Sequence, residues 1–380
     1  MEADKDISLR ETSLKPEFER RLASMRANMR SAKQDAALLF SLHNLRYLFN
    51  YSGEAAYGIA TQDELVIITD YRFSEQAQEE AQQANIAAKV VCRDRDRQSL
   101  GQAIHVELMR RGVQNCWYEA EHVSVGIWNA IVQENLGVTF MPSLGVLEQQ
   151  RKIKDAWEVA QMQAAAKIGD QALAMLIPKI KLGVSEREIA LELDYQMQKL
   201  GSEGLSFVTI LGFGARSALP HCIPSERRLR EGDLLVLDFG AVVNGYRSDM
   251  TRSFVAGRAD SKQAAMYDTV LTAQYAAMSV LKNGLPAQAA NTAALTILKA
   301  SPFAQYAGLG LGHGVGLQLH EQPFINAVCT DTLRSQYVVT IEPGIYIPGY
   351  GGVRIEDDVL ITDDAFVRLT QAPKNFELAI

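Results

Sequence analysis

The stretch "LDFGAVVNGYRSDMTRSF", residues 237 to 254, most constrains how this chain can fold. The Asn-Gly pair in its middle, between strand-prone segments, is typical of a two-residue type I′ hairpin turn. Continued outward from that turn, the pairing places Asp238 opposite Thr251. Asp238 and Asp249 then become diagonal neighbours on one face of the ribbon. Two carboxylates this close repel each other unless a cation or a shared proton lies between them.

A second acid pair repeats the arrangement in "VVTIEPGIYIPGYGGVRIEDDVLI". Glu342 and Glu356 flank a turn formed by residues 348–352, so a hairpin centred there brings the two acids nearly opposite each other. Arg354 lies two residues from Glu356 and therefore on the same strand face. A single acid pair on a strand is often solvated or paired with a nearby arginine. Two such pairs, close to a glycine-rich histidine motif, favour a functional interpretation.

That motif is "GLGHGVGLQLHEQP", residues 310 to 323. His313 lies between glycines, which allow the backbone to approach a ligand closely. His320 follows in the same motif, and His221 lies in another turn-rich part of the second half. The remaining histidines have no such neighbours and are expected to be structural: His43, His105 and His122.

Four carboxylates with one imidazole form a mostly hard, oxygen-rich ligand set. Carboxylates suit Mg²⁺ and Mn²⁺, and a histidine shifts the preference toward Mn²⁺, Co²⁺ or Zn²⁺. Four acids exceed what one divalent ion needs for charge balance. Two ions roughly 3.5 to 4 Å apart, bridged by carboxylates and a water, would account for all four. A bridging water becomes a hydroxide-like nucleophile near neutral pH.

The bulk composition narrows the class of protein. A chain of 380 residues suggests two domains, and a net charge of -7 argues against a nucleic-acid or anionic-membrane surface. The start, "MEADKDISLR", is polar where a signal peptide needs an apolar core, and no apolar run reaches the roughly 20 residues that span a bilayer. We therefore expect a cytoplasmic protein whose four scattered cysteines are free thiols.

Strand-like and helix-like segments alternate up to about residue 150, which predicts an α/β domain over residues 1–150. The stretch "QQRKIKDAWEVAQMQAAAKIGDQAL" is expected to begin a long helix at the domain junction. Ser185 and Glu188 fit a capping box at the start of a further helix. Strands and glycine-rich turns then predominate, with helices again at about 262 to 300. Residues 151–380 are thus predicted to form an α+β C-terminal domain.

The sequence resembles the pita-bread-fold metallopeptidases, which include methionine aminopeptidases, aminopeptidases P and prolidases. The resemblance rests on five blocks: "SALPHCIPSERRL", "DLLVLDFGAVVNGYRSDMTRSF", "GHGVGLQLHE", "IEPGIYI" and "GGVRIEDDVLIT". Upstream, "NLRYLFNYSG", "ITDYRFSEQA" and "RKIKDAWEVAQM" are similar to the creatinase-type N-terminal domain and linker of the Xaa-Pro branch. The likeness covers roughly residues 17 to 370.

The resemblance implies five metal ligands, which are Asp238, Asp249, His313, Glu342 and Glu356. Asp249 and Glu356 would bridge two ions, Asp238 would hold one, and His313 with Glu342 the other. Glu342 would also accept a proton from the attacking water.

Further positions match the family's substrate-contacting residues. His221 and His320 match non-ligand histidines that contact the substrate and stabilise the tetrahedral intermediate, and Arg354 matches an arginine of the proline-specific members. In one departure, Leu309 stands four residues before the ligand histidine, where many Xaa-Pro peptidases have a histidine. Leucine cannot donate a hydrogen bond, so the departure bears on substrate preference and rate.

The implied activity is hydrolysis of the bond before proline at a peptide N-terminus, by a dipeptidase or an aminopeptidase. The substrate is a small peptide with proline in second position, and two divalent ions, most simply Mn²⁺, with Co²⁺ or Zn²⁺ as alternatives, serve as cofactors. An apolar pocket for the proline ring could use Phe207, Phe213 or Tyr346, and sequence does not choose among them. The family also suggests a homodimer, with no nucleic-acid or membrane partner.

Two other hypotheses stay open from the residues. A metal-independent, creatinase-like amidinohydrolase is disfavoured because such relatives lose several ligands, whereas this chain keeps all five. A non-catalytic binding protein on the same fold would show a replaced ligand, and none is replaced. A methionine aminopeptidase normally lacks the extra N-terminal domain.

Overall fold

The computed structural model describes residues 15–134 and 137–380, which divide into two compact units. One unit comprises Glu17–Arg151, and the other runs from Lys152 to Ile380. Residues 1–10, whose polar composition argued against a signal peptide, lie outside the described residues. Within those that are described, no helix combines the length and the apolar character that crossing a membrane requires.

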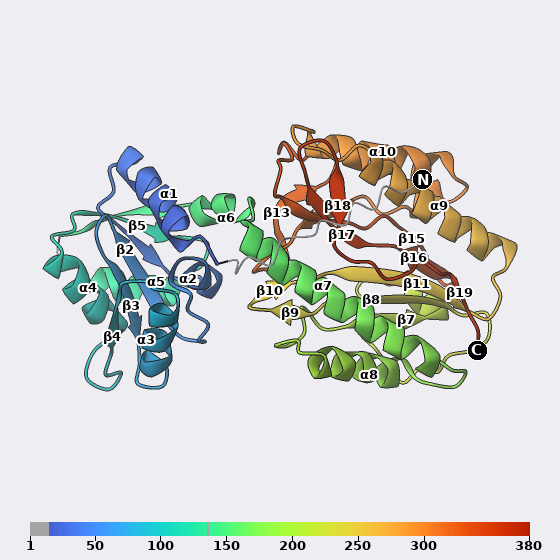
Figure 1. The fold of residues 1–380 in the computed structure, drawn as a ribbon, viewed down its shortest axis with the longest axis horizontal. Coiled ribbons are helices and arrows are strands. Elements are labelled where there is room, and N and C mark those ends of the chain that lie inside the picture. The colour runs from blue at the N-terminus through green and yellow to red at the C-terminus, as the bar shows by residue number, and fades with distance from the viewer. Residues whose placement is uncertain (1–14, 135–136) are drawn as a thin grey trace. The chain divides into compact units, whose positions relative to one another are not determined.

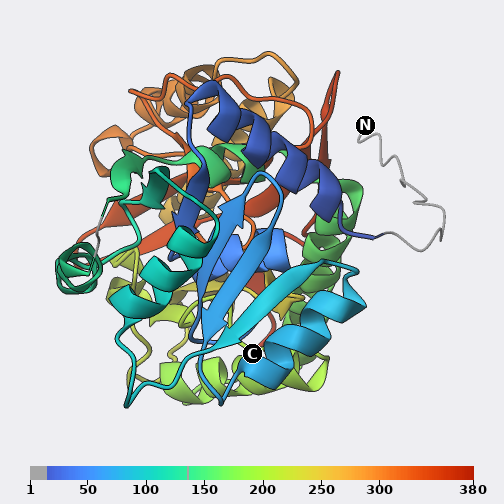
Figure 2. The same cartoon turned by 90° about the vertical axis from the view of Figure 1, so that its left-hand side faces the viewer.

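The first unit alternates helices and strands, as its sequence predicted. In chain order its elements are α1 (Phe18–Ser31), β1 (Ala36–Leu39), α2 (Leu42–Phe49), β2 (Tyr57–Thr61), β3 (Leu65–Thr69), α3 (Ser74–Gln83), β4 (Ala88–Cys92), α4 (Leu100–Arg110), β5 (Asn115–Glu119), α5 (Val125–Gln133), β6 (Thr139–Ser143) and α6 (Val146–Arg151). The strands form one mixed sheet in the order β4-β3-β2-β1-β5-β6, seen in Figure 2. Its central strands are buried because helices cover them, which explains their near-continuous apolar sequence.

The second unit is built from long helices and short, glycine-punctuated strands. In chain order its elements are α7 (Ala156–Leu176), η1 (Ile177–Lys179), α8 (Glu186–Lys199), β7 (Ile210–Phe213), η2 (Gly214–Ala218), β8 (Leu234–Phe239), β9 (Val242–Val243), β10 (Tyr246–Arg247), β11 (Met250–Ala256), α9 (Ser261–Ser279), α10 (Ala287–Ala300), η3 (Ala304–Tyr306), β12 (Gly312–Gly314), β13 (Glu321–Ile325), β14 (Val338–Ile341), β15 (Gly344–Ile347), β16 (Gly351–Arg354), β17 (Asp357–Ile361), β18 (Phe366–Arg368) and β19 (Glu377–Leu378).

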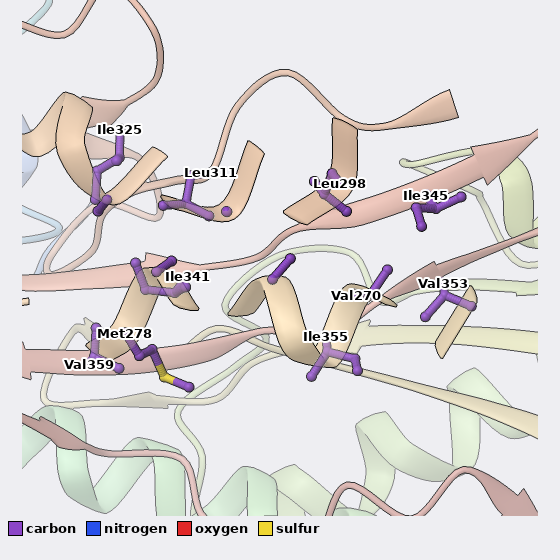
Figure 3. Close-up of a cluster of buried hydrophobic side chains, with 14 of the residues drawn as sticks. Val270, Met278, Leu298, Leu311, Ile325, Ile341, Ile345, Val353, Ile355 and Val359 are labelled. Atoms are coloured by element: carbon purple, nitrogen blue, oxygen red, sulfur yellow. The ribbon is translucent and has the colours of Figure 1, made fainter. Parts of the chain in front are cut away.

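Helices cover the strands of this unit from two sides (Figure 1). Helices α7 and α8 pack on β7, β8 and β11 through one apolar core that includes Leu193 and Phe254. Helices α9 and α10 pack on β12 to β17 through a second core, of which Figure 3 labels Val270, Leu298 and Ile341 among others. The strands between these two cores therefore present little surface to water, and polar side chains among them are buried.

The first hairpin forms as its sequence predicted. Asn244 and Gly245 both have positive φ, 48° and 77°, as a type I′ turn requires. Outward from the turn, β11 pairs with β8 so that Thr251 faces Asp238. The register is fixed because a slip of one residue would turn the apolar side chains out of the core.

The domain junction differs from the sequence prediction of one long helix. Helix α6 ends at Arg151 and α7 begins only at Ala156, with residues 152–155 between them. Asp155 is the reason, because its side chain accepts a hydrogen bond from Glu158 N, and the Glu158 side chain accepts one from Asp155 N. This capping box starts a new helix rather than continuing the old one.

A buried polar network ties α6 to the sheet of the first unit. Glu119, at the end of β5, accepts hydrogen bonds from Phe40 N at 2.7 Å and Asn44 Nδ2 at 2.6 Å. Glu148 accepts from Asn44 Nδ2 at 2.7 Å and lies 3.0 Å from His122 Nε2. The hydrogen bond to Glu148 raises the pKa of His122. Although burial opposes it, hydrogen bonds from His122 and Asn44 lower the pKa of Glu148 to about 2.

Stability should therefore depend on pH through the His122–Glu148 pair. Because the pKa of His122 is raised on folding, its contribution to stability is fully present below about pH 6.5 and is lost as the pH rises through the pKa of the folded state. Because the pKa of Glu148 is lowered on folding, its contribution is present above about pH 4.5 and is lost as the pH falls toward 2. We expect His122→Gln to lower the free energy of unfolding by about 1 kcal/mol at pH 5.5 and by much less at pH 9. Urea unfolding followed by tryptophan fluorescence measures both values. An equal loss at the two pH values would contradict the assignment.

Candidate metal centre

The first acid pair lies on the ribbon made by β8 and β11. Asp238 is on β8, and Asp249 immediately precedes β11, so pairing of the two strands places both carboxylates on one face. The opposite face carries Phe239 and Met250, which are buried in the core beneath α7 and α8. The alternation of the ribbon thus leaves the two aspartates facing away from that core, toward the other strands of the unit.

The second acid pair, Glu342 and Glu356, lies between two antiparallel strand pairs that share one register. Strand β14 pairs with β17 so that Ile341 faces Asp357, and β15 pairs with β16 so that Gly344 faces Arg354. Glu342 and Glu356 occupy the interval, and the common register places them opposite each other, as the sequence predicted. Neither glutamate belongs to a strand, and Glu356 N donates to Thr251 O, on the ribbon that carries the aspartates, at 3.1 Å.

His313 on the short strand β12 completes the cluster. Its Nδ1 lies 3.0 Å from Gly314 O, so Nδ1 carries the proton and Nε2 is left with a lone pair. Nε2 lies 3.4 Å from Glu342 Oε1 and 3.7 Å from Asp249 Oδ2. A Cβ at Gly312 would lie 2.0 Å from Thr340 O, so the backbone beside the histidine approaches β14 too closely for any other residue.

The geometry fits a divalent cation. Asp249, His313 and Glu356 each offer a ligand atom, and these atoms all lie within 4.8 Å of one another. Asp238 Oδ1 and Asp249 Oδ1 are buried without a hydrogen-bond partner, which is costly for carboxylate oxygens unless a cation binds them. Oxygen atoms with one imidazole nitrogen are the donor set expected for Mn²⁺, Co²⁺ or Zn²⁺.

Burial and mutual repulsion raise the pKa values of the acids in this cluster. Burial, together with the charges of Glu356 and Asp238, raises the pKa of Asp249 well above its ordinary value. Burial and the charges of Glu342 and Asp238 do the same to the pKa of Glu356. Burial also lowers the pKa of His313, so its imidazole is neutral at physiological pH, as a metal ligand must be. A bound cation would remove the repulsion that raises the acid pKa values.

Arg354 supports the cluster from the side. Its guanidinium donates to Asp238 Oδ2 at 2.5 Å and to Thr251 Oγ1 at 2.9 Å. Thr251 in turn donates to Glu356 Oε2 at 2.6 Å, so one chain of hydrogen bonds joins an acid of each ribbon. Arg354 is only 3% exposed, and its guanidinium also donates to the hydroxyl of Tyr346 at 2.9 Å and to Pro220 O at 3.0 Å.

Sequence reasoning missed the hydrogen-bonding residues behind the ligands. Thr340 Oγ1 donates to Glu342 Oε1 at 3.0 Å and accepts from His313 N at 3.1 Å. Asp358 Oδ2 accepts from Asp249 N at 2.8 Å and so fixes the backbone of that aspartate. The signal was available, because both residues lie two positions from a glutamate of the cluster on the same strand face.

A buried ion network lies below Glu356. Arg252, 1% exposed, donates to Glu356 O at 2.6 Å and to the Asp357 carboxylate at 2.8 Å. Lys374 Nζ lies 2.7 Å from the other oxygen of Asp357. Although burial opposes it, these two cations lower the pKa of Asp357. Asp357 is therefore ionised and satisfied by protein, in contrast to the acids of the cluster.

The two other predicted histidines lie beside the cluster. The ring centroids of His320 and His313 are 4.4 Å apart in an edge-on arrangement. Burial, with smaller effects from His313 and His221, lowers the pKa of His320. Both His221 and His320 are exposed.

The structure also separates the residues considered for a proline pocket. Phe213 is 0% exposed within the core beneath α8, so it cannot contact a substrate. Phe207 and Tyr346 are half-buried and stay available. Leu309 precedes β12 and is 79% exposed.

Comparison with known proteins adds independent information. The sequence model of metallopeptidase family M24 matches residues 160–363, and that of the creatinase/prolidase N-terminal domain matches residues 21–153. YqhT of Bacillus subtilis, described as an uncharacterized peptidase, is 32% identical over 340 residues, which cover 90% of this chain and 94% of that protein.

Two solved structures share the fold over nearly their whole length. The Xaa-Pro dipeptidase from Bacillus anthracis superposes with a TM-score of 0.90 and 32% identity, covering 95% of this chain and 100% of that one. The X-Pro aminopeptidase from Thermotoga maritima gives a TM-score of 0.87 and 28% identity, with 94% and 99% covered. The prediction of a creatinase-type N-terminal domain followed in the chain by a pita-bread domain is thereby confirmed.

Replacing one central acid should separate metal binding from folding. We expect Asp249→Asn to weaken binding of divalent ions by roughly a hundredfold or more, because it removes a charged ligand atom shared by the cluster. The metal-free variant should unfold at no lower temperature than metal-free wild type, since the mutation also removes repulsion. Metal content by mass spectrometry and thermal unfolding test this. A variant that kept the wild-type metal content would contradict the site.

Proposed function

The chain belongs to metallopeptidase family M24, and on that basis we propose that it hydrolyses the bond preceding proline at the N-terminus of a small peptide. The observation that carries the proposal is the cluster of buried acids with oxygens lacking protein partners, beside a neutral histidine. The activities named for the structures from Bacillus anthracis and Thermotoga maritima supply the choice of a Xaa-Pro bond.

In this proposal the cluster holds two divalent ions. Asp238, Asp249, His313, Glu342 and Glu356 would hold these ions as ligands. Asp249, His313 and Glu356 support this most directly, since their ligand atoms already converge. Mn²⁺ is the simplest choice for this donor set, with Co²⁺ and Zn²⁺ as alternatives.

Divalent ions bound here would supply positive charge that polarises the scissile carbonyl and makes a water molecule acidic. Glu342 would take the proton of the attacking water; its pKa is raised by burial and by Asp238, which suits a base that must later release that proton. Thr340 holds one oxygen of Glu342 and leaves the other for the proton.

His320 and His221 would serve the substrate. The lowered pKa of His320 keeps the imidazole neutral, so it can donate one hydrogen bond to the oxygen of the scissile carbonyl as negative charge develops there. His221, from the loop after η2, would contact the peptide on the exposed side. A Xaa-Pro bond has no N–H, so the site needs no acceptor at that position.

Arg354 would act through Asp238 rather than on the peptide. Its side chain is buried, and its hydrogen bonds to Asp238, Thr251 and Tyr346 already occupy the guanidinium on this side. We therefore assign it the task of keeping Asp238 ionised and oriented toward the ions. A homodimer, a cytoplasmic location and the limits of the catalytic domain, residues 151–380, stay predictions, as does the choice between dipeptidase and aminopeptidase.

A substrate series tests the activity. Protein stripped of metal and re-supplied with single ions should hydrolyse Xaa-Pro dipeptides or Xaa-Pro-Xaa tripeptides and leave a Met-Ala control intact. Release of the N-terminal amino acid, measured by chromatography, gives the rate for each ion. Full activity of the metal-free protein would instead favour the metal-independent amidinohydrolase, and no turnover with any ion would favour a binding protein.

The role of His320 has its own test. We expect His320→Ala to keep both the metal content and KM while lowering kcat about 100-fold, because a donor to the developing oxyanion is lost. Steady-state kinetics on a Xaa-Pro dipeptide, with metal analysis of the same sample, distinguish this from a ligand role. Unchanged kcat would remove His320 from the mechanism.

A further inference from the structure

The loop between β12 and β13 carries His320, and no hydrogen bond or ion pair with another described residue holds that side chain. The ring of His320 is exposed, makes an edge-on contact with His313, and forms no hydrogen bond with a described residue. The direction of its imidazole therefore depends on the conformation of the loop, residues 315–320.

A buried ion pair fixes that loop from inside. Glu321, which follows His320, is 6% exposed at its side chain, and its Oε2 lies 3.3 Å from Nζ of Lys154, whose side chain is 2% exposed. The other oxygen of Glu321 accepts from Gln318 N at 3.1 Å. A Cβ at Gly316 would lie 2.9 Å from Glu321 Oε2, so the carboxylate fills the inside of the loop.

Lys154 is itself fixed in place. Its backbone N–H donates to Gln336 O at 2.9 Å, and the next residue, Asp155, is the N-cap of α7. Lys154 thus reaches Glu321 from a rigid segment of the same unit. Removing a single charge of such a buried pair leaves the other unpaired, which forces the surrounding structure to shift.

We propose that Lys154 is a positioning residue, which through Glu321 sets the loop that aims His320 at the scissile carbonyl. This inference rests on the proposed function. A displacement of about 1 Å at a group that contacts the reacting carbonyl is enough to cost roughly 100-fold in rate. The ion pair of Lys154 and Glu321 therefore affects the rate of hydrolysis as well as the structure of the loop.

The chain offers a matched control two residues upstream. Lys152 Nζ pairs with Asp331 Oδ1 at 2.9 Å, and the Lys152 side chain is 3% exposed. Asp331 O accepts from Ala287 N at the start of α10, so this second pair holds a segment without a residue of the metal cluster. Lys152→Met removes a buried lysine charge from the same segment without reaching the loop of His320.

The experiment compares Lys154→Met with Lys152→Met in the metal-loaded full chain. Lys154→Met should lower kcat on a Xaa-Pro dipeptide roughly 10- to 100-fold, with metal content and KM unchanged, and should speed amide exchange of the loop. Lys152→Met should keep kcat within about twofold at a comparable fall in unfolding temperature. In a His320→Ala background, Lys154→Met should have no further effect on kcat, because the group it positions is gone.

Unchanged kcat in Lys154→Met, or an undiminished loss of kcat when His320 is already alanine, would overturn the inference. The proposed function fails separately, by absence of turnover in the wild type. In that case amide exchange of the loop would still test whether Lys154 anchors it, because equal exchange in the two lysine variants would overturn that role.

Discussion

Repulsion among buried carboxylates is the constraint on which the second unit depends. Burial and the charges of neighbouring carboxylates raise the pKa values of Asp249, Glu356 and Glu342. Such an arrangement costs folding free energy in the absence of a counter-charge. The surrounding hydrogen bonds hold the backbones and flanks of these acids, while leaving oxygens of Asp238 and Asp249 unpartnered. The fold therefore maintains an excess of buried negative charge, which a bound divalent cation would neutralise.

Different neighbours make adjacent acids behave in opposite ways. Asp357 follows Glu356 and is equally buried, yet Arg252 and Lys374 keep its pKa low, whereas the pKa of Glu356 is raised. Two consecutive acids thus differ, because protein cations neutralise Asp357, whereas Glu356 is left for a bound metal cation. The buried arginines support the site at its edges: Arg354 holds the side chain of Asp238, and Arg252 holds the backbone of Glu356.

Sequence patterns predicted the hairpins because turn chemistry and the two-residue period are local. Asn244 and Gly245 determine the turn, and the register of Asp238 with Thr251 follows from it. The capping box at Ser185 forms for the same reason, whereas the one at Asp155 begins a new helix where the sequence predicts a continuous one. The roles of Thr340, Asp358 and Lys154 could not be predicted, because each depends on a contact between segments far apart in sequence. The sequence shows that Leu309 departs from the family pattern, but only the structure shows that its side chain is exposed.

The uninterrupted register on both sides of Glu342 and Glu356 limits how this region can diverge. An insertion or deletion of one residue in either arm, between 343 and 347 or between 351 and 355, would rotate one glutamate to the opposite side of the sheet while leaving its partner in place. Changes in length are compatible with both glutamates only at the tip, residues 348–350, where the chain reverses. Evolution can thus lengthen the tip freely, while the two arms can change only in amino-acid type or by matched changes in both.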